Sequence, residues 1–118
     1  MIIYIAGPMT GVVNNNYVAF NEMAARLREM DHVVLNPAEL PAPPQEACLA
    51  GRELWTSYMR QCLALVTTTQ CIVMLAGWRN SEGAQKEYAL AGWLDIPVIY
   101  SWIELKPQLE SVRRRLAR

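Results

Sequence analysis

The sequence has no excess of charge of one sign and no long hydrophobic run. Its 118 residues include eleven basic and eleven acidic side chains, whereas binding to nucleic acid or anionic membranes through charge requires a basic excess. No apolar run approaches the roughly 20 residues of a membrane-spanning helix. The N-terminal residues have neither the basic segment nor the apolar length of a signal peptide. These absences predict a cytoplasmic protein that binds neither nucleic acid nor membranes.

Cysteine and histidine are scarce as well. Cys48, Cys62 and Cys71 follow no metal-binding spacing, and an odd number of thiols is typical of a reducing compartment. We expect Cys62 and Cys71 to be buried, reduced and unpaired, and Cys48 to react first with a thiol reagent. The single histidine, His32, has no evident partner and is expected at the surface. The sequence therefore predicts neither a metal nor any other cofactor.

Apolar segments predict alternating strands and helices in a single domain, residues 1–118. The expected strands are 2–6, 33–36, 71–75 and 97–100, and the expected helices are 17–30, 52–67, 82–94 and one starting near Pro107. Continuous apolar strands that alternate with helices favour a parallel sheet covered on both faces. We predict a flavodoxin-like, Rossmann-like α/β fold of three layers. Its sheet would have four to five strands in the order 2-1-3-4.

In this strand order the winding reverses between the first and third strands, and ligands bind at the carboxyl ends of such strands. Two polar, glycine-containing loops, 7–16 and 77–83, follow those ends, although turn geometry alone would also account for their glycines. Neither G-x-G-x-x-G nor a Walker A motif is present, which argues against the corresponding phosphate-binding loops. The candidate substrate-binding residues are Gly7, Pro8, Met9, Asn16, Gly77, Trp78, Asn80, Ser81 and Gly83.

Two of these candidates have more specific expectations. Ser81 immediately precedes a predicted helix and is expected to cap it. Trp78 lies in the polar loop and is the tryptophan best placed to stack on a base. Trp55, Trp93 and Trp102 are expected in the core or in an interface instead, because large aromatic side chains are usually buried there.

Glu87 breaks the apolar pattern of the helix expected over 82–94. It lies within the arc that includes Ala84 and Ala91, and this arc should face the sheet. A carboxylate in such a place is costly unless it is hydrogen-bonded, neutral or facing a cavity. The alternative is a boundary residue whose charged end reaches solvent. Periodicity alone leaves both interpretations open.

Five short segments carry a specific combination of residues. They are IYIAGPMTG (3–11), Asn16 with AFN (19–21), NPAE (36–39), YMR (58–60), and LAGWRNSEGA (75–84) with Glu87. Together they resemble a family of small proteins of unknown function, the DUF4406 group, which is placed in the nucleoside 2-deoxyribosyltransferase-like superfamily. The resemblance covers most of residues 2–100.

The resemblance implies a flavodoxin-like fold and an enzyme that acts on the N-glycosidic bond of a nucleoside or nucleotide. The catalytic glutamate of the superfamily lies on the helix after the third strand, a position matched by Glu87. It attacks the anomeric carbon, and a second base or water then takes up the sugar. An aromatic residue near the end of the first strand matches Tyr4, which would orient the carboxylate. The resemblance also implies no metal or redox cofactor and a homodimer or higher homo-oligomer.

The sequence departs from the superfamily pattern at three positions. Cys62 and Cys71 stand where relatives usually carry aspartates, and Asn80 stands at a position that is often acidic. These replacements favour an alternative, a non-catalytic module that binds or senses a nucleoside or nucleotide. A protein-interaction domain that has kept the scaffold is the third possibility.

Overall fold

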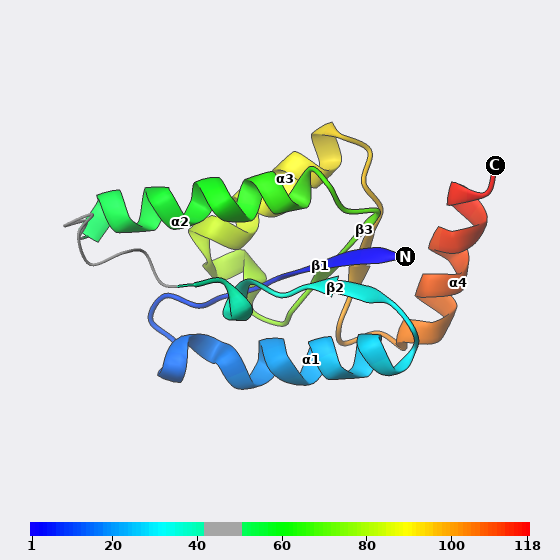
Figure 1. The fold of residues 1–118 in the computed structure, drawn as a ribbon, viewed down its shortest axis with the longest axis horizontal. Coiled ribbons are helices and arrows are strands. Elements are labelled where there is room, and N and C mark those ends of the chain that lie inside the picture. The colour runs from blue at the N-terminus through cyan, green and yellow to red at the C-terminus, as the bar shows by residue number, and fades with distance from the viewer. Residues whose placement is uncertain (42–50) are drawn as a thin grey trace.

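The computed structural model describes residues 1–41 and 51–118, in which strands and helices alternate as the sequence predicts (Figure 1). The strands are β1 (Ile2–Ala6), β2 (Val33–Leu35), β3 (Cys71–Met74) and β4 (Val98–Tyr100). The helices are α1 (Tyr17–Glu29), α2 (Gly51–Val66), α3 (Glu82–Trp93) and α4 (Leu105–Leu116). Short 3-10 turns are η1 (Val13–Asn16), η2 (Pro37–Glu39) and η4 (Trp78–Asn80). Pro107 lies in the first turn of α4, where its missing amide hydrogen is tolerated.

The four strands form a parallel sheet in the order β2-β1-β3-β4. Tyr4 of β1 is in register with Leu35 of β2 on one side and with Ile72 of β3 on the other. The chain therefore passes from β2 across β1 to β3, and the winding reverses between β1 and β3. This arrangement confirms the predicted fold class and strand order.

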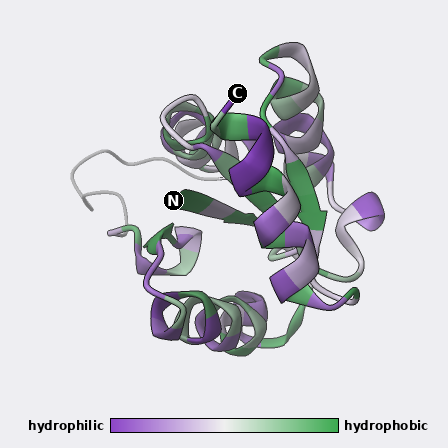
Figure 2. Cartoon of the chain, turned by 90° about the vertical axis from the view of Figure 1, so that its right-hand side faces the viewer, coloured by the Kyte–Doolittle hydropathy of each residue, from purple (hydrophilic) through white to green (hydrophobic). Residues whose placement is uncertain are grey.

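The sheet separates two apolar layers, because successive side chains of a strand point to opposite faces. Ile3 and Ile5 of β1 pack with residues of α1 and α4, whereas Tyr4 and Ala6 pack with residues of α2 and α3. In Figure 1, α1 and α2 lie on opposite sides of the strands. Figure 2 shows strands that are mostly hydrophobic among helices in which hydrophobic and hydrophilic residues are mixed. The two layers supply the core that positions the loops at the ends of the strands.

Gln108 of α4 blocks part of the free edge of β4. Its side-chain oxygen accepts a hydrogen bond from the Tyr100 amide at 2.9 Å, and its side-chain nitrogen donates to the Tyr100 carbonyl at 2.9 Å. An unpaired strand edge is a template for a further strand. Because Gln108 occupies both groups of Tyr100, the sheet cannot extend by pairing at that residue.

His32 corrects one expectation, because only 8% of its surface is exposed. The ammonium group of Met1 donates a hydrogen bond to His32 Nδ1 at 3.1 Å, and burial lowers the pKa of the imidazole. The residue thus helps to hold the start of β1. Within residues 1–41 and 51–118, no helix combines the length and hydrophobicity that crossing a bilayer requires. The expected cytoplasmic location stays a prediction.

Candidate active site

A pocket of about 540 Å³ lies where the loops after β1, β2 and β3 meet α2 and α3. This is the carboxyl end of the sheet, at the reversal of winding that the sequence indicated. The predicted site residues that line it are Tyr4, Gly7, Met9, Asn80, Ser81, Gly83 and Glu87. The fold therefore brings together residues that are more than 80 positions apart in the chain.

Four predicted residues lie outside the lining of this pocket: Pro8, Asn16, Gly77 and Trp78. The Asn16 side chain donates a hydrogen bond to the Pro8 carbonyl at 2.9 Å and so shapes the loop after β1. Gly77 has a φ of +84°, a left-handed conformation that glycine adopts without strain. It immediately precedes η4, and a side chain there would contact Pro8. Gly77 and Pro8 thus lie where the two loops approach each other, and none of the four residues lines the pocket.

Trp78 packs away from the pocket. Its ring is only 8% exposed and lies 4.5 Å, centroid to centroid, from that of Tyr88. The tryptophan that does line the pocket is Trp55 of α2, which the sequence placed in the core or an interface. The sequence did contain a signal for this position. Trp55 is three or four residues from Arg52, Tyr58 and Met59, and residues so spaced share one face of a helix.

Glu87 forms part of the pocket and is only 5% exposed, which excludes the interpretation of a side chain reaching into solvent. Ser81 caps α3 by accepting a hydrogen bond from the Ala84 amide at 3.2 Å. Glu87 follows in the second turn of this helix and lines the same pocket as Tyr4. Neither Glu87 Oε2 nor Tyr4 Oη has a hydrogen-bond partner within the described part of the chain. A buried polar atom without a partner is unfavourable unless a ligand or water satisfies it.

Burial raises the pKa of the Glu87 carboxyl to about 8, and the neighbouring Tyr4 hydroxyl partly offsets this increase. The charged form is disfavoured because little solvent or fixed positive charge stabilises it. At neutral pH the carboxyl is therefore mostly protonated. Burial also raises the pKa of Tyr4 well above its ordinary value, so the phenol keeps its proton and remains available as a donor.

Cys62 and Cys71 are both buried and free, as predicted, but they lie on opposite faces of the sheet. Cys62 lines the pocket, and burial raises its pKa to about 11. Cys71 packs beneath α1 and α4, and burial raises its pKa to about 12. Both therefore carry neutral thiols at physiological pH. Cys48 lies outside the described residues.

Tyr58 connects α2 to two loops of the site. Its hydroxyl lies 3.0 Å from the Pro37 carbonyl oxygen, to which it donates, and 3.2 Å from Met9 Sδ. Pro37 and Met9 both line the pocket. Burial raises the pKa of Tyr58, so the hydroxyl stays a donor. This contact holds the loops after β1 and β2 against the helix that carries Trp55.

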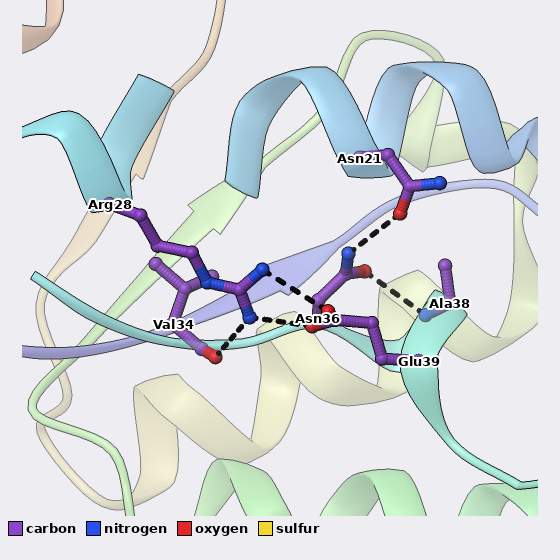
Figure 3. Close-up of polar contacts among 6 residues, drawn as sticks. All are labelled: Asn21, Arg28, Val34, Asn36, Ala38 and Glu39. Carbon is purple, nitrogen blue, oxygen red and sulfur yellow. Dashed lines mark hydrogen bonds and ion pairs between the residues drawn. The ribbon is translucent and has the colours of Figure 1, made fainter. Parts of the chain in front are cut away.

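The NPAE segment after β2 is held by a hydrogen-bond network (Figure 3). The side-chain nitrogen of buried Asn36 donates to Asn21 Oδ1 at 2.9 Å, and Asn36 Oδ1 accepts from the Ala38 amide at 3.0 Å. Arg28 donates to both carboxylate oxygens of Glu39, at 2.6 and 3.1 Å. These bonds tie η2 to α1 and thereby place Pro37 in the pocket wall.

Arg52 and Glu82 face each other at the pocket, one from the start of α2 and the other from the start of α3. Two hydrogen bonds of 2.9 and 2.8 Å join the guanidinium to the carboxylate. The guanidinium carbon also lies 4.0 Å from the centroid of the Trp55 ring. In the described ranges, no three His, Cys, Asp or Glu side chains are grouped closely enough to hold a metal ion.

Gly83 allows α2 and α3 to approach closely. A Cβ at this position would lie 2.9 Å from Met59 Sδ, closer than such contacts normally occur. A Cβ at Gly7 would likewise lie only 2.7 Å from the Cβ of Leu75. Both glycines line the pocket, and their role is to permit close packing around it.

A family model described as "Domain of unknown function (DUF4406)" matches residues 1–100. The matched region contains every residue that lines the pocket. No curated protein matches the chain.

Proposed function

The chain belongs to the DUF4406 family, and we propose that its pocket binds a nucleoside or nucleotide whose N-glycosidic bond is cleaved through Glu87. The observation that carries this proposal is a buried carboxyl with one unpartnered oxygen in a pocket of about 540 Å³. Ligand pockets commonly measure about 300–1,000 Å³, so the volume is of the size expected for a small ligand such as a nucleoside. The position of Glu87 also matches the nucleophile expected from the resemblance to nucleoside 2-deoxyribosyltransferases.

A carboxylate suits this reaction because cleavage of an N-glycosidic bond passes through an oxocarbenium-like transition state. The Glu87 oxygen forms a bond to the anomeric carbon while the bond from that carbon to the base nitrogen breaks. The electron pair stays on the base, which takes up a proton from solvent; the water or second base that attacks in the next step gives up one in turn. Water or the nitrogen of a second base then attacks the same carbon and releases the carboxylate. Hydrolysis and transfer thus share the first step.

Tyr4 and Trp55 have separate roles in this proposal. The Tyr4 hydroxyl lies close enough to the Glu87 carboxyl to lower its pKa, and it would donate to the carboxylate and orient it once Glu87 is ionised. Trp55 offers an aromatic surface on the pocket wall, and nucleobases stack on such surfaces. Met9 and Tyr58 would enclose the sugar between the two.

The central experiment compares wild type with Glu87→Gln. A panel of 2′-deoxynucleosides and ribonucleosides is incubated with each protein, and base release is followed by chromatography. Loss of the nucleophile should lower the rate by several orders of magnitude, as is common when a covalent catalyst is removed. Ligand binding should persist, because the amide has nearly the same shape. Intact-protein mass spectrometry should find a glycosyl adduct on wild type alone.

Glu29→Gln is the matched control, because Glu29 is an exposed glutamate of α1. It should release base at the wild-type rate. A Glu87→Gln protein that retains the full rate per folded molecule would remove Glu87 from the mechanism, and the proposal with it.

The pH dependence provides a second test. A nucleophilic carboxylate must be ionised, and the pKa of Glu87 is about 8. The value of kcat/KM, which reports the ionisation of free enzyme, should therefore rise with pH and level off above about 8. A rate that falls over the same range would indicate that protonated Glu87 is the active form.

A binding module without catalysis is the second candidate, and Cys62 is the observation that favours it. This neutral thiol lines the pocket where the resemblance leads one to expect an acid. Under this alternative, calorimetry would detect a nucleoside bound to wild type, while no base would be released at any pH. Both candidates share the same ligand class, and the mass-spectrometric adduct separates them.

We also propose that the chain forms a homodimer or a higher homo-oligomer. Trp93 and Leu94 at the end of α3 are 79% and 48% exposed, and Trp102 and Ile103 after β4 are 55% and 49% exposed. Exposed apolar side chains of this size are common in interfaces. Light scattering at roughly tens of micromolar, well above the dissociation constants of stable complexes, should give at least twice the monomer mass. A monomer mass would contradict the proposal.

A further inference from the structure

The pocket lining is unevenly supplied with charged groups. Of the described residues that line it, Arg52 is the one cation, whereas Glu82 and Glu87 are both carboxyls. Glu87 is the deeper of the two and ionises only near pH 8. The lining therefore has no surplus positive charge at neutral pH, and it gains negative charge when Glu87 ionises.

The Arg52 guanidinium is already engaged on two sides. Both of its terminal nitrogens bond to Glu82, at 2.9 and 2.8 Å, and its flat face lies over Trp55. This bidentate arrangement is also the geometry with which arginine binds phosphate. Glu82 thus occupies the donors that an anionic ligand would use.

Glu82 is charged at neutral pH, because hydrogen bonds from Arg52 lower the pKa of its carboxyl. Lys86, one turn further along α3, lies 3.8 Å from the same carboxylate but does not line the pocket. The side chains of Arg52 and Glu82 are 65% and 51% exposed, and exposed ion pairs contribute little to folding stability. The pair therefore bears on what the pocket admits more than on whether the chain folds.

We infer that Glu82 makes the pocket selective for an uncharged N-glycoside over its phosphorylated counterpart. This inference rests on the proposed function. A 5′-phosphate would have to separate Arg52 from Glu82 and would then lie beside a free carboxylate, with the carboxyl of Glu87 close by. A nucleoside requires neither change, because it presents only the base, the sugar and its hydroxyl groups.

The test measures equilibrium binding of the common 2′-deoxynucleosides and their 5′-monophosphates to wild type, Glu82→Gln and Arg52→Gln by calorimetry. Wild type should bind the nucleoside more tightly than the monophosphate. In Glu82→Gln the freed guanidinium should shift the ratio of the two dissociation constants toward the monophosphate by about fivefold, the size expected for a partly exposed charge pair. The gain should diminish as salt is raised.

Arg52→Gln is the matched variant, since it breaks the same ion pair from the other side. It leaves the carboxylate without supplying a free guanidinium, and the shift toward the monophosphate should be absent. Both residues are largely exposed, so both variants should fold, and circular dichroism checks this.

Two results would overturn the inference while leaving the proposed function intact. One is a wild type that binds a nucleoside but prefers its monophosphate, and the other is an unchanged ratio in Glu82→Gln. A wild type that binds neither compound would overturn the inference and the proposed function together.

Discussion

The two faces of the sheet use the same strands for different purposes. On the face covered by α1 and α4, β1 contributes Ile3 and Ile5, which pack into an apolar core. On the face covered by α2 and α3, β1 contributes Tyr4, whose hydroxyl lies in a pocket with Glu87. Adjacent residues of one strand therefore serve a closed core and a candidate site.

The difference between the two faces shows where the fold leaves buried polar atoms without hydrogen-bond partners. The two buried side-chain atoms without partners in the described residues, Tyr4 Oη and Glu87 Oε2, both lie on the pocket face. Such conflicts between local rules and the global fold concentrate at functional sites. Among the residues that the structure describes, the α1 and α4 face contains a buried thiol, Cys71, but no buried carboxyl. The face covered by α1 and α4, the closed face, therefore stabilises the fold, whereas the pocket face contains two polar atoms whose burial is unfavourable.

Paired substitutions in β1 would test this contrast most strongly. Ile5→Ala leaves a cavity in the closed core, and we expect it to lower the free energy of unfolding by about 2–5 kcal/mol. Tyr4→Phe removes a hydroxyl that has no hydrogen-bond partner within the described residues, so the loss of unfolding free energy should stay below about 1 kcal/mol. Under the proposed function, base release should slow. Urea denaturation measures the free energy of unfolding of both variants. Equal losses for the two variants would mean that the faces do not differ in this way.

The pH dependence of stability is a second, somewhat smaller effect. The pKa of Glu87 is raised in the folded protein from 4.5 to about 8. The folded protein is therefore stabilised relative to the unfolded chain most fully below about pH 4.5, and this stabilisation is lost as the pH rises through 8. Wild type should lose roughly 3 kcal/mol of unfolding free energy relative to Glu87→Gln between pH 5 and 8. Denaturation curves at both pH values provide the comparison. Parallel pH profiles for the two proteins would show that Glu87 is not buried as described.

The cysteines provide the smallest test, because one free thiol lies on each face. Cys62 lines the pocket and Cys71 lies in the closed core, so both should react slowly in native protein. Cys62 should nevertheless react before Cys71, and a bound nucleoside should slow its reaction alone. Cys48 should be modified ahead of both. Mass spectrometry of peptides after timed alkylation gives the order, and rapid labelling of Cys71 would contradict it.

Much of the fold was predictable because the relevant signals are local. Apolar strands, amphipathic helices and their alternation depend on residues within a few positions of one another, and the predicted order 2-1-3-4 is the observed one. Glu87 was recognisable as an exception, since it conflicts with the pattern of its own helix, but its burial was one of two interpretations that this pattern left open. Ser81 was correctly assigned as the cap of α3.

Other features depend on distant residues and left no local signal. Trp78 and Trp55 are both aromatic residues near predicted loops or helix ends, but only packing against Tyr88 turns the first away from the pocket. His32 looked exposed because its partner, the ammonium group of Met1, lies 31 positions away in the sequence. The pairing of Arg52 with Glu82 likewise joins residues of two helices.

The elements, their order and a carboxyl set among apolar residues can be recognised from the amino-acid sequence, because each of these depends on short-range periodicity. The folded chain was needed to establish which side chains meet at the pocket, which oxygen atoms lack partners among the described residues and how far the pKa of Glu87 rises. These properties arise from desolvation and from contacts between segments that folding alone brings together. For that reason the place of the pocket and seven of its lining residues could be predicted from the sequence, whereas the burial of Glu87 and the presence of Trp55 and Arg52 in the pocket could not.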